Sequence, residues 1–532
     1  MASQGDAQKM KSWSGPLLMG IDVGTFASKG VLCTMDAHVV AHHEVEHNLD
    51  VPRAGWAEQD ADAVWWHDVS VLCRRLIELA GATARDIAAL AVSAHGADLV
   101  PLDAQGRALR PGILYGVDTR ATNEISELNE RFGRDAIAKI SGHFLSTQSI
   151  GPKMLWLRHN EPEIWRKTRY LCSASTFLVY RLTGQYVFDY PTAAWFDPLL
   201  NLASLSWDES MVEQVIGDKE LPELHWVKEV VGEVTPEASR ATGLAIGTPV
   251  TTGTLDAVAD AVSVGVNAPG DLMVMYGTTT FLLHVRDTLP PPDGVLWHTP
   301  FVSPGQYALE GGTATTGAVT RWFRDQFAKA ELSQQAAGGT EAYSVLTREA
   351  EMAPPGSGGL VLLPYFSGER TPLHDPDARG LIIGLNLTHG RGHFYRAILE
   401  ATAFAVAHNL EALRASGAEL KRAIAVGGGT KSPLLLQIVS DVTGLEQDVG
   451  AQTVGAAYGD AFVAGVATGI LRDSALREQW VRFNRHYVPN VALQERYREL
   501  YGIYRDLYLQ TRSAMHALSR FDATYGNAGL DS

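Results

Sequence analysis

Two aspartates stand beside Gly/Thr turns, a setting in which a carboxylate can take part in phosphate chemistry. Asp22 precedes the turn in "GIDVGTFASKG", and Asp256 follows the turn in "PVTTGTLDAVADAVSVGV". The small residues Gly24 and Thr25 let backbone N–H groups approach an oxyanion closely, so phosphate is the natural guest. Asp22 could then hold Mg²⁺ through water, because Mg²⁺ prefers oxygen ligands and keeps much of its hydration. An ordinary D-x-G-T β-turn has the same pattern and remains an alternative at this point.

Asp256 lies between its turn and the small-residue segment "DAVADAVSVG", which predicts a helix whose positive end the carboxylate faces. A carboxylate in that place is either a helix cap or a positioned base. The two roles are compatible, and the local pattern leaves both open.

A second Gly/Thr turn, "YGTTT", repeats the arrangement later in the chain and offers Thr278 and Thr279. Each turn joins two apolar stretches, so each predicts a hairpin. Two such hairpins that face each other across a cleft could bind the two ends of a triphosphate. The repeat therefore favours a phosphate-binding interpretation of both turns over two unrelated β-turns.

A third glycine-rich segment, "AIAVGGGTKSPLLLQIVSD", places three glycines between an apolar strand and a helix. Ser432 is expected to be the N-cap of that helix and Pro433 its first residue. The glycines remove side chains, so a flat ring or a ribose phosphate can lie against the backbone at the positive helix end. The segment is not a P-loop, because Thr430 stands where the final glycine of that motif is required.

Hydrophobic patterns predict the elements that position these turns. The first half reads as three strands, a helix and a strand, at 17–22, 28–35, 39–47, 61–81 and 87–96. The second half reads as a hairpin, two helices, a strand and a helix, at 269–285, 315–332, 393–417, 423–429 and 432–444. Because both halves open with a Gly/Thr hairpin, the chain is predicted to be an internal duplication.

The length of 532 residues favours at least two domains with a ligand cleft between them. The predicted division is a flexible N-terminal tail, a substrate-side domain, a nucleotide-side domain and a C-terminal helical tail, at 1–16, 17–267, 268–480 and 481–532. The tail carries tyrosines at helical spacing, which predict a packing surface: Tyr497, Tyr501, Tyr504 and Tyr508.

Composition excludes several classes of function. The formal net charge of −16 disfavours nonspecific nucleic-acid binding. No stretch has the uninterrupted apolar length of a membrane span, and the polar start lacks the apolar core of a signal peptide. The three cysteines are too far apart for a metal knuckle or a C-x-x-C pair, so a reducing cytoplasm fits best.

These pieces occur together and in an order that resembles the FGGY family of carbohydrate kinases. The most specific match is "GLIIGLNLTHGRGHFYRAILE", Gly380 to Glu400, which satisfies the C-terminal signature of the family. Supporting matches are "DVGT", "GWAEQD", "PKMLWLRHNEPE", "GTLDAVADAVSVG", "GAVTRWFRD" and "GGGTKSP". The resemblance implies an α/β fold of the duplicated actin and hexokinase (ribonuclease H-like) type, with ATP and substrate in the interdomain cleft.

The resemblance also implies roles for individual residues. Asp256 matches the catalytic base, which accepts the proton of the hydroxyl that attacks the γ-phosphate of ATP, and Mg²⁺ would bridge the phosphates near Asp22 and Asp256. The implied nucleotide-binding residues, including those suggested above by the turns and glycines, are Asp22, Gly24, Thr25, Thr278, Thr279, Gly317, Arg321, Gly428, Gly429 and Ser432.

The substrate is less clearly indicated, because the sequence departs from the patterns of xylulose and glycerol kinases. An ungapped alignment puts Gly96 and Ala97 where those enzymes show Met-His or Arg-Glu. The flanking His95 and Asp98 are candidates to supply the missing hydrogen bonds. Asp118, in the segment "LYGVDTRA", resembles part of the D-x-R element of pentulose kinases, with one extra residue in the spacing.

The expected activity is ATP-dependent phosphorylation of a ketopentose of the xylulose or ribulose type. A kinase of glycerol, erythritol or another polyol is the first alternative. An actin-like ATPase that acts on a protein partner is a distant one. The resemblance makes a homodimer unsurprising.

Overall fold

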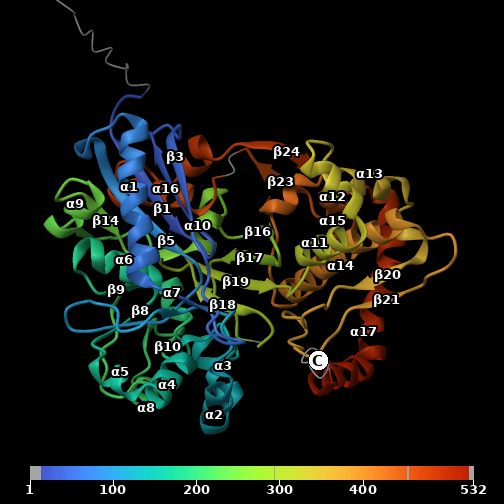
Figure 1. Ribbon diagram of the computed structural model, residues 1–532, viewed down its shortest axis with the longest axis horizontal. Coiled ribbons are helices and arrows are strands. Elements are labelled where there is room, and N and C mark those ends of the chain that lie inside the picture. Colours follow the sequence, from blue (N-terminus) through green and yellow to red (C-terminus); the bar gives the residue numbers. More distant parts are fainter. Residues whose placement is uncertain (1–12, 293, 452–453, 526–532) are drawn as a thin grey trace, which may run out of the picture.

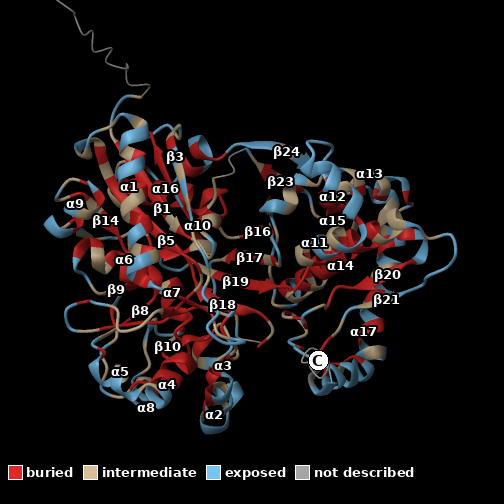
Figure 2. Cartoon of the chain, viewed as in Figure 1, coloured by how far each residue is buried: buried red, intermediate tan, exposed pale blue. Residues whose placement is uncertain are grey.

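The computed structural model describes residues 13–292, 294–451 and 454–525, which form two lobes side by side (Figure 1). The predictions for residues 1–12 and 526–532 lie outside the described residues. Each lobe is built around a seven-stranded sheet of the described chain, and Figure 2 shows that the central strands of both sheets are buried. The predicted two-domain α/β architecture is therefore confirmed.

The sheet of the first lobe has the order β13-β14-β5-β1-β2-β3, and β15 also pairs with β5. These strands are β1 Leu17–Val23, β2 Ala27–Cys33, β3 Val39–Glu46, β5 Ile87–Ala94, β13 Val230–Glu233, β14 Pro249–Thr251 and β15 Thr254–Leu255. The hairpin β1–β2 is antiparallel, with Asp22 opposite Lys29, whereas β5 runs parallel to β1. The three predicted opening strands and the later parallel strand are all present.

The sheet of the second lobe has the order β18-β19-β17-β16-β22-β23-β24. These strands are β16 Asp271–Tyr276, β17 Thr280–Arg286, β18 Trp297–Pro300, β19 Tyr307–Gly312, β22 Arg422–Val426, β23 Gln447–Gly450 and β24 Phe483–Tyr487. The order β19-β17-β16-β22-β23 repeats the order β3-β2-β1-β5-β14, with the same antiparallel hairpin and the same parallel neighbour. This repeat confirms the predicted duplication.

Helices and short strands cover both sheets. Those of the first lobe are η1 Ala61–Trp66, α1 His67–Ala80, α2 Thr122–Phe132, α3 Arg134–Ser141, α4 Ile150–Asn160, α5 Pro162–Lys167, α6 Ala174–Thr183, α7 Tyr190–Ala194, α8 Glu209–Val215, α9 Pro236–Thr242, α10 Asp256–Ser263, β4 Glu58–Gln59, β6 Val100–Leu102, β7 Gly112–Ile113, β8 Tyr170–Cys172, β9 Val187–Asp189, β10 Leu200–Asn201, β11 Ser206–Trp207 and β12 Glu223–His225. Those of the second half of the chain are α11 Gly317–Phe327, α12 Lys329–Ala336, α13 Ala342–Met352, α14 Arg391–Ala415, η4 Gly428–Lys431, α15 Pro433–Thr443, α16 Ala456–Ala467, α17 Val491–Tyr525, β20 Val361–Leu363 and β21 Leu381–Ile383.

Helix α16 joins the two halves, because it comes late in the chain yet packs against β1 of the first lobe (Figure 1). Glycines permit this approach. A Cβ on Gly20 of β1 would lie 1.9 Å from the carbonyl oxygen of Ala457, and a Cβ on Gly459 of α16 would lie 2.0 Å from the carbonyl oxygen of Ala259 in α10. Side chains of α16 therefore reach the carboxyl ends of β1 and β5.

The long helix α17 closes the second lobe. Tyr497, Tyr504 and Tyr508 are buried in one apolar cluster, and the hydroxyl of Tyr508 donates to Asp375 at 2.7 Å. The predicted packing role of the tyrosine stripe is thereby confirmed. No helix formed by the described residues combines the length and apolar character needed to cross a membrane.

Candidate active site

The first Gly/Thr corner is the tight turn between β1 and β2. The N–H of Gly24 donates to the carbonyl of Ala27 at 3.0 Å, and the carbonyl of Gly24 lies 2.9 Å from Nε2 of His47. Nδ1 of His47 in turn lies 2.8 Å from the carboxylate of Asp68 on α1. The backbone of the corner is thus held by its own turn and by His47.

Gln59 connects this corner to the centre of the first lobe. Its side-chain Nε2 donates to the carbonyl of Thr25 at 2.8 Å, and its Oε1 accepts from Nε1 of Trp65 at 2.9 Å. The same Oε1 lies 2.9 Å from Nε2 of His95. Since Oε1 can only accept, Nε2 of His95 is the donor. Gln59 was not singled out from the sequence, although it lies inside the "GWAEQD" match.

Asp256 is the first residue of α10, and Leu255 occupies the N-cap position. The alternative of a helix-capping carboxylate is therefore wrong, because Asp256 lies one residue inside the helix and makes no capping hydrogen bond; its Oδ1 instead accepts the N–H of the next residue, Ala257, at 2.7 Å. Burial raises the pKa of Asp256, and the nearby charge of His95 opposes that rise. The carboxylate is thus held in place and partly withdrawn from water, as a base for an alcohol needs to be.

Asp22 lies close enough to Asp256 for their charges to repel each other. Burial, and then the charge of Asp256, raises the pKa of Asp22. The hydroxyl of Ser93 lies 3.0 Å from Oδ1 of Asp22 and 2.6 Å from Oδ2 of Asp460 on α16. Burial also raises the pKa of Asp460 and of Asp260. Several carboxylates with little compensating positive charge thus surround Asp22.

This donor set fits Mg²⁺, because oxygen ligands with excess negative charge suit a hard divalent cation that also binds phosphates. Within the described ranges, no group of three or more His, Cys, Asp or Glu side chains is arranged as a complete metal site.

The second Gly/Thr corner, between β16 and β17, is packed against the start of α11. The carbonyl of Thr278 accepts the N–H of Ala318 at 2.9 Å, and a Cβ on Gly317 would lie 2.1 Å from the carbonyl oxygen of Gly277. Only glycine permits this approach. The corner and the N-terminus of α11 are therefore joined into one unit by backbone hydrogen bonds and close packing.

A cavity of about 780 Å³ opens beside this corner in the second lobe. Six of the residues predicted to contact nucleotide line it, namely Thr278, Gly317, Arg321, Gly428, Gly429 and Ser432. Ser432 is the N-cap of α15, accepting from the N–H of Leu435 at 3.3 Å, and Pro433 is the first residue of that helix, as predicted. Thr279 does not line the cavity, and its carbonyl accepts the N–H of Gly277 at 2.9 Å.

The residues predicted to bind substrate are occupied by protein partners. Nδ1 of His95 forms an ion pair with Asp98 at 2.8 Å, and Oδ1 of Asp98 accepts the N–H of Tyr115 at 3.0 Å. Burial lowers the pKa of His95, but Asp98 and Asp256 outweigh it and the net shift is upward. His95 and Asp98 therefore lie beside Asp256, but their polar atoms bind the protein in this conformation.

Asp118 is buried away from that cluster. It accepts the N–H of Ala57 at 2.7 Å and forms an ion pair with Arg120, also at 2.7 Å. Both side chains are fully buried, and Glu58 pairs with the same guanidinium at 2.8 Å. A direct contact between Asp118 and substrate stays a prediction, and the observed hydrogen bonds favour a structural role.

Tyr115 is a residue that the sequence did not indicate. Its hydroxyl lies 2.9 Å from Oγ1 of Thr25, so it touches the first Gly/Thr corner. Its backbone is held by Lys153, whose Nζ donates to the carbonyls of Leu114, Tyr115 and Thr147 at 2.7–2.8 Å. Burial lowers the pKa of Lys153 to about 8, partly offset by the charges of Asp118 and Asp98.

Replacing Lys153 with Met should destabilise the first lobe. The change keeps most of the side-chain volume but leaves the three carbonyls without their donor, which costs about 2–4 kcal/mol. A fall in the midpoint of thermal unfolding measures this effect. Lys219→Met is the matched control, because Nζ of Lys219 donates to one carbonyl, that of Thr168, from a half-buried position. Equal losses in the two variants would contradict the structural role of Lys153.

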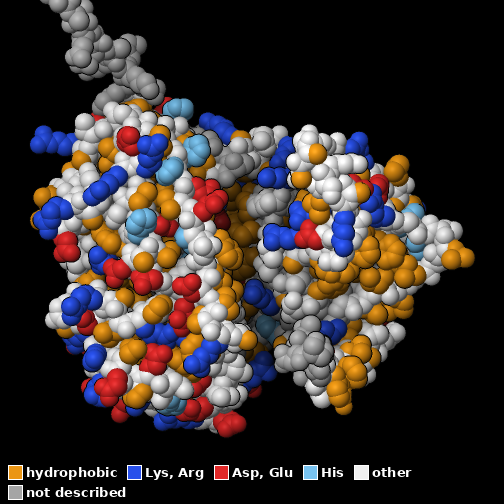
Figure 3. All heavy atoms as spheres, viewed as in Figure 1, with side chains coloured by type: hydrophobic (Ala, Val, Ile, Leu, Met, Phe, Trp, Pro, Cys, Tyr) orange, Lys and Arg blue, Asp and Glu red, His pale blue; other side chains and the backbone are white. Residues whose placement is uncertain are grey.

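A groove separates the two lobes in the space-filling view, with basic side chains visible inside it (Figure 3).

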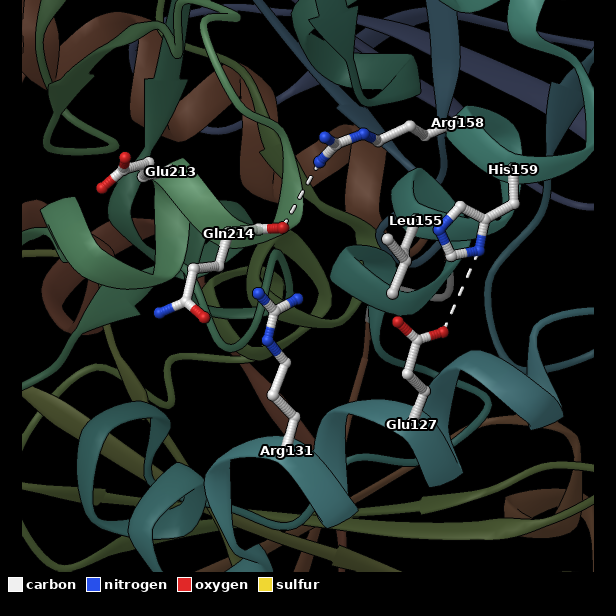
Figure 4. A pocket seen from close by; sticks show the side chains of 7 residues that line it. All are labelled: Glu127, Arg131, Leu155, Arg158, His159, Glu213 and Gln214. Atoms are coloured by element: carbon white, nitrogen blue, oxygen red, sulfur yellow. Dashed lines mark hydrogen bonds and ion pairs between the residues drawn. The ribbon is translucent and has the colours of Figure 1, made fainter.

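A second cavity, of about 740 Å³, lies elsewhere on the first lobe between α2, α4 and α8 (Figure 4). It contains none of the sequence-predicted site residues and is lined by Glu127, Arg131, Leu155, Arg158, His159, Glu213 and Gln214. The residues that the sequence predicted to act chemically therefore lie outside this second cavity.

Two family models match the chain. Residues 17–263 match the N-terminal domain of the FGGY family of carbohydrate kinases, and residues 272–468 match its C-terminal domain. The two ranges lie on either side of residue 267, where the sequence analysis places the domain boundary.

Individual relatives resemble the chain over nearly its whole length. The xylulose kinase of Bacillus subtilis (strain 168) is 28% identical over 509 residues, which are 95% of this chain and 99% of the relative. The autoinducer-2 kinase of Klebsiella pneumoniae (strain ATCC 700721 / MGH 78578) is 30% identical over 92% of this chain and 93% of its own. The crystal structure of xylulose kinase from Rhodospirillum rubrum superposes with a TM-score of 0.86 at 31% identity, covering 94% of this chain and all of that one.

Proposed function

The chain belongs to the FGGY family of carbohydrate kinases and is a sugar kinase, and from that premise we propose that its acceptor is a ketopentose of the xylulose type. The relatives named as xylulose kinases support this substrate class. Ribulose is the closest chemical alternative, because it offers the same kinds of hydroxyl and carbonyl groups in another stereochemistry.

One observation carries the assignment of the nucleotide to the second lobe. Six residues that the sequence associated with nucleotide binding, from three separate segments, line a single cavity. The N-termini of α11 and α15 both lie at this cavity, where the positive ends of the helix dipoles favour an anion. We therefore place the base and ribose of ATP near Gly428, Gly429 and Ser432, and its phosphates beside Thr278 and Gly317.

Asp256 is proposed as the general base. Its carboxylate would accept a hydrogen bond from the attacking hydroxyl, orient its oxygen toward the γ-phosphate and take the proton late, because the transition state of phosphoryl transfer is loose. Thr25 and Gly24 would bind phosphate oxygens from the first lobe. Asp22 and Asp256 would hold Mg²⁺, which supplies positive charge to the phosphates when bound.

Coupled ADP release tests the substrate class directly. Purified protein is assayed with ATP and a panel of ketopentoses, aldopentoses, glycerol, erythritol and autoinducer-2, which the name of one relative suggests. We expect kcat/KM for a ketopentose to exceed that for every polyol. A polyol or autoinducer-2 with the highest kcat/KM would replace the ketopentose, and ATP turnover that ignores every compound would favour an ATPase with a protein partner.

Gly428→Leu should weaken ATP binding selectively. A Cβ at Gly428 meets nothing within 4 Å, and the residue lines the cavity, so a larger side chain would occupy space assigned to the nucleotide. We expect the KM for ATP to rise about tenfold or more, which corresponds to at least roughly 1.4 kcal/mol, with little change in the KM for sugar. Steady-state kinetics measure both values.

Gly502→Leu is the control, because a Cβ at Gly502 in α17 also meets nothing within 4 Å and lies far from the cavity residues in the chain. An unchanged KM for ATP in Gly428→Leu would place the nucleotide elsewhere. The expectations of a homodimer, of no nucleic-acid partner and of a cytoplasmic location stay predictions.

A further inference from the structure

Arg370 belongs to the segment between β20 and β21 in the second lobe. The residues before and after it, Glu369 and Thr371, are buried and hydrogen-bonded to the protein. The buried carboxylate of Glu369 accepts the N–H of Ala314 at 2.7 Å and the N–H of Arg370 at 2.8 Å. The hydroxyl of the buried Thr371 lies 3.0 Å from the carbonyl of Gly312. Backbone hydrogen bonds between Glu369 and Asp375 close the loop around Arg370. The position of Arg370 is therefore set by a rigid frame.

The guanidinium of Arg370 forms no ion pair with any described carboxylate, although it is half-buried. The adjacent Glu369 is directed to backbone amides instead. Other shielded arginines are paired, including Arg110 with Glu58, Arg120 with Asp118 and Arg396 with Glu400. Burial lowers the pKa of the Arg370 guanidinium, in part against the charge of Glu369. A shielded cation that lacks an anionic partner is suited to bind an anionic ligand.

The frame of Arg370 adjoins the second Gly/Thr corner, because Gly312 and Ala314, which Thr371 and Glu369 bind, lead into α11. Just before α11, Oγ1 of Thr316 lies 2.8 Å from Oγ1 of Thr280, and both residues line the cavity assigned to the nucleotide. The charge of Arg370 also acts on Tyr115 of the first lobe. The two side chains interact electrostatically, since the positive charge of Arg370 acts to lower the pKa of Tyr115 while burial and the charge of Asp256 act to raise it. The hydroxyl of Tyr115 lies 2.9 Å from Oγ1 of Thr25. Tyr115 thus contacts Thr25 of the first corner, and the charges of Asp256 and Arg370 both act on it.

Lys153, the other cation close to Tyr115, is not available for such a role. Its ammonium group is 1% exposed and donates to three carbonyls. Lys29, opposite Asp22 in the β1–β2 hairpin, is directed to Glu44, with 3.9 Å between Nζ and Oε1, and is largely exposed. Lys153 and Lys29 are thus both engaged by other groups, whereas Arg370 forms no ion pair with a described carboxylate.

We propose that Arg370 binds the phosphoryl group during its transfer and stabilises the charge on its equatorial oxygens. The inference rests on the proposed function, to which it adds a catalytic residue. In the reaction, a bond forms between the sugar oxygen and the γ-phosphorus, and the bond from that phosphorus to the bridging oxygen breaks. The electron pair of the broken bond leaves with ADP, and the proton of the sugar hydroxyl passes to Asp256. Arg370 keeps its protons and donates hydrogen bonds throughout.

Arg370→Ala and Arg370→Lys test the proposal, with Arg379→Ala as a matched control from the same loop. Arg379 donates to the carbonyls of Pro376 and Ala378 and to the hydroxyl of Ser519, away from Tyr115. We expect Arg370→Ala to lower kcat about 100-fold or more, with both KM values changed less than about threefold. Arg370→Lys should recover part of the loss, and added guanidinium ion should raise the kcat of Arg370→Ala. Arg379→Ala should retain the wild-type kcat.

A transition-state analogue separates this role from a structural one. Wild-type protein with sugar, ADP and aluminium fluoride should form a tight inhibited complex, whereas Arg370→Ala should not, although both bind ADP alone equally. Equal inhibition by aluminium fluoride, or a defect confined to the KM for sugar, would overturn the role of Arg370 while leaving the kinase assignment intact. A wild-type protein that phosphorylates no sugar in the panel would overturn the proposed function and this inference together.

Discussion

Asp256→Asn is expected to lower kcat by about two to four orders of magnitude, the range for a positioned general base. The amide keeps the shape and the hydrogen bond with the N–H of Ala257, but it cannot accept the proton of the attacking hydroxyl. ADP binding should be little changed, because the nucleotide cavity lies in the second lobe. Single-turnover kinetics measure the loss, and titration with ADP measures the retained affinity.

Asp189→Asn is the matched control for Asp256→Asn. Asp189 is also a buried carboxylate of the first lobe with a raised pKa, but its Oδ2 accepts from the hydroxyl of Thr254 at 2.7 Å and serves the packing of α7. We expect this variant to lose thermal stability and to keep kcat within about tenfold. If Asp256→Asn retained more than a tenth of the wild-type turnover, Asp256 would not be the base.

Removal of divalent cations with EDTA should lower the rate by at least about three orders of magnitude, and added Mg²⁺ should restore it. The reason is that two carboxylates and the phosphates of ATP would otherwise face one another without a counter-charge, and a bound cation contributes several kcal/mol to such a transition state. Titration of the rate with Mg²⁺ measures the requirement.

Asp22→Asn extends the same test to a named side chain. Because burial and the charge of Asp256 already disfavour ionised Asp22, its carboxylate gains most from a cation. The variant should need about ten times more Mg²⁺ for half-maximal rate, a loss of roughly 1.4 kcal/mol in binding. Asp36→Asn removes an exposed carboxylate from the β2–β3 turn of the same sheet and should not change this requirement. Full activity without a divalent cation, or an unchanged requirement in Asp22→Asn, would remove the metal from this site.

Local sequence patterns predicted the parts of the site that depend on backbone conformation. The turns at Gly24 and Gly277, the N-cap at Ser432 and the hairpins on either side of the Gly/Thr corners were all predicted, because glycine, threonine, serine and proline act over a few residues. The duplication was also predicted from the sequence, because both halves open with the same hydrophobic hairpin and Gly/Thr turn.

The sequence did not predict hydrogen-bond partners that lie far apart in the chain. Gln59 joins Thr25 to His95, and Tyr115 bonds with Thr25 across 90 residues. The sequence indicated His95 and Asp98 as substrate ligands, but it did not show that their polar atoms bind one another, Gln59 and Tyr115. Asp118 was likewise indicated without its partner, the N–H of Ala57.

By itself, the sequence determined the α/β duplication, the family, the two Gly/Thr corners and the position of Asp256 at the start of a helix. The tertiary structure alone decided that α16 packs against β1, which carries Asp22, that the loop of Arg370 is bonded to the segment between β19 and α11, and which polar side chains are already bound. The physical reason is the distance along the chain over which each interaction acts. Turns and caps are specified by neighbouring residues, whereas hydrogen bonds and charges act between side chains that only the packing of the lobes brings together.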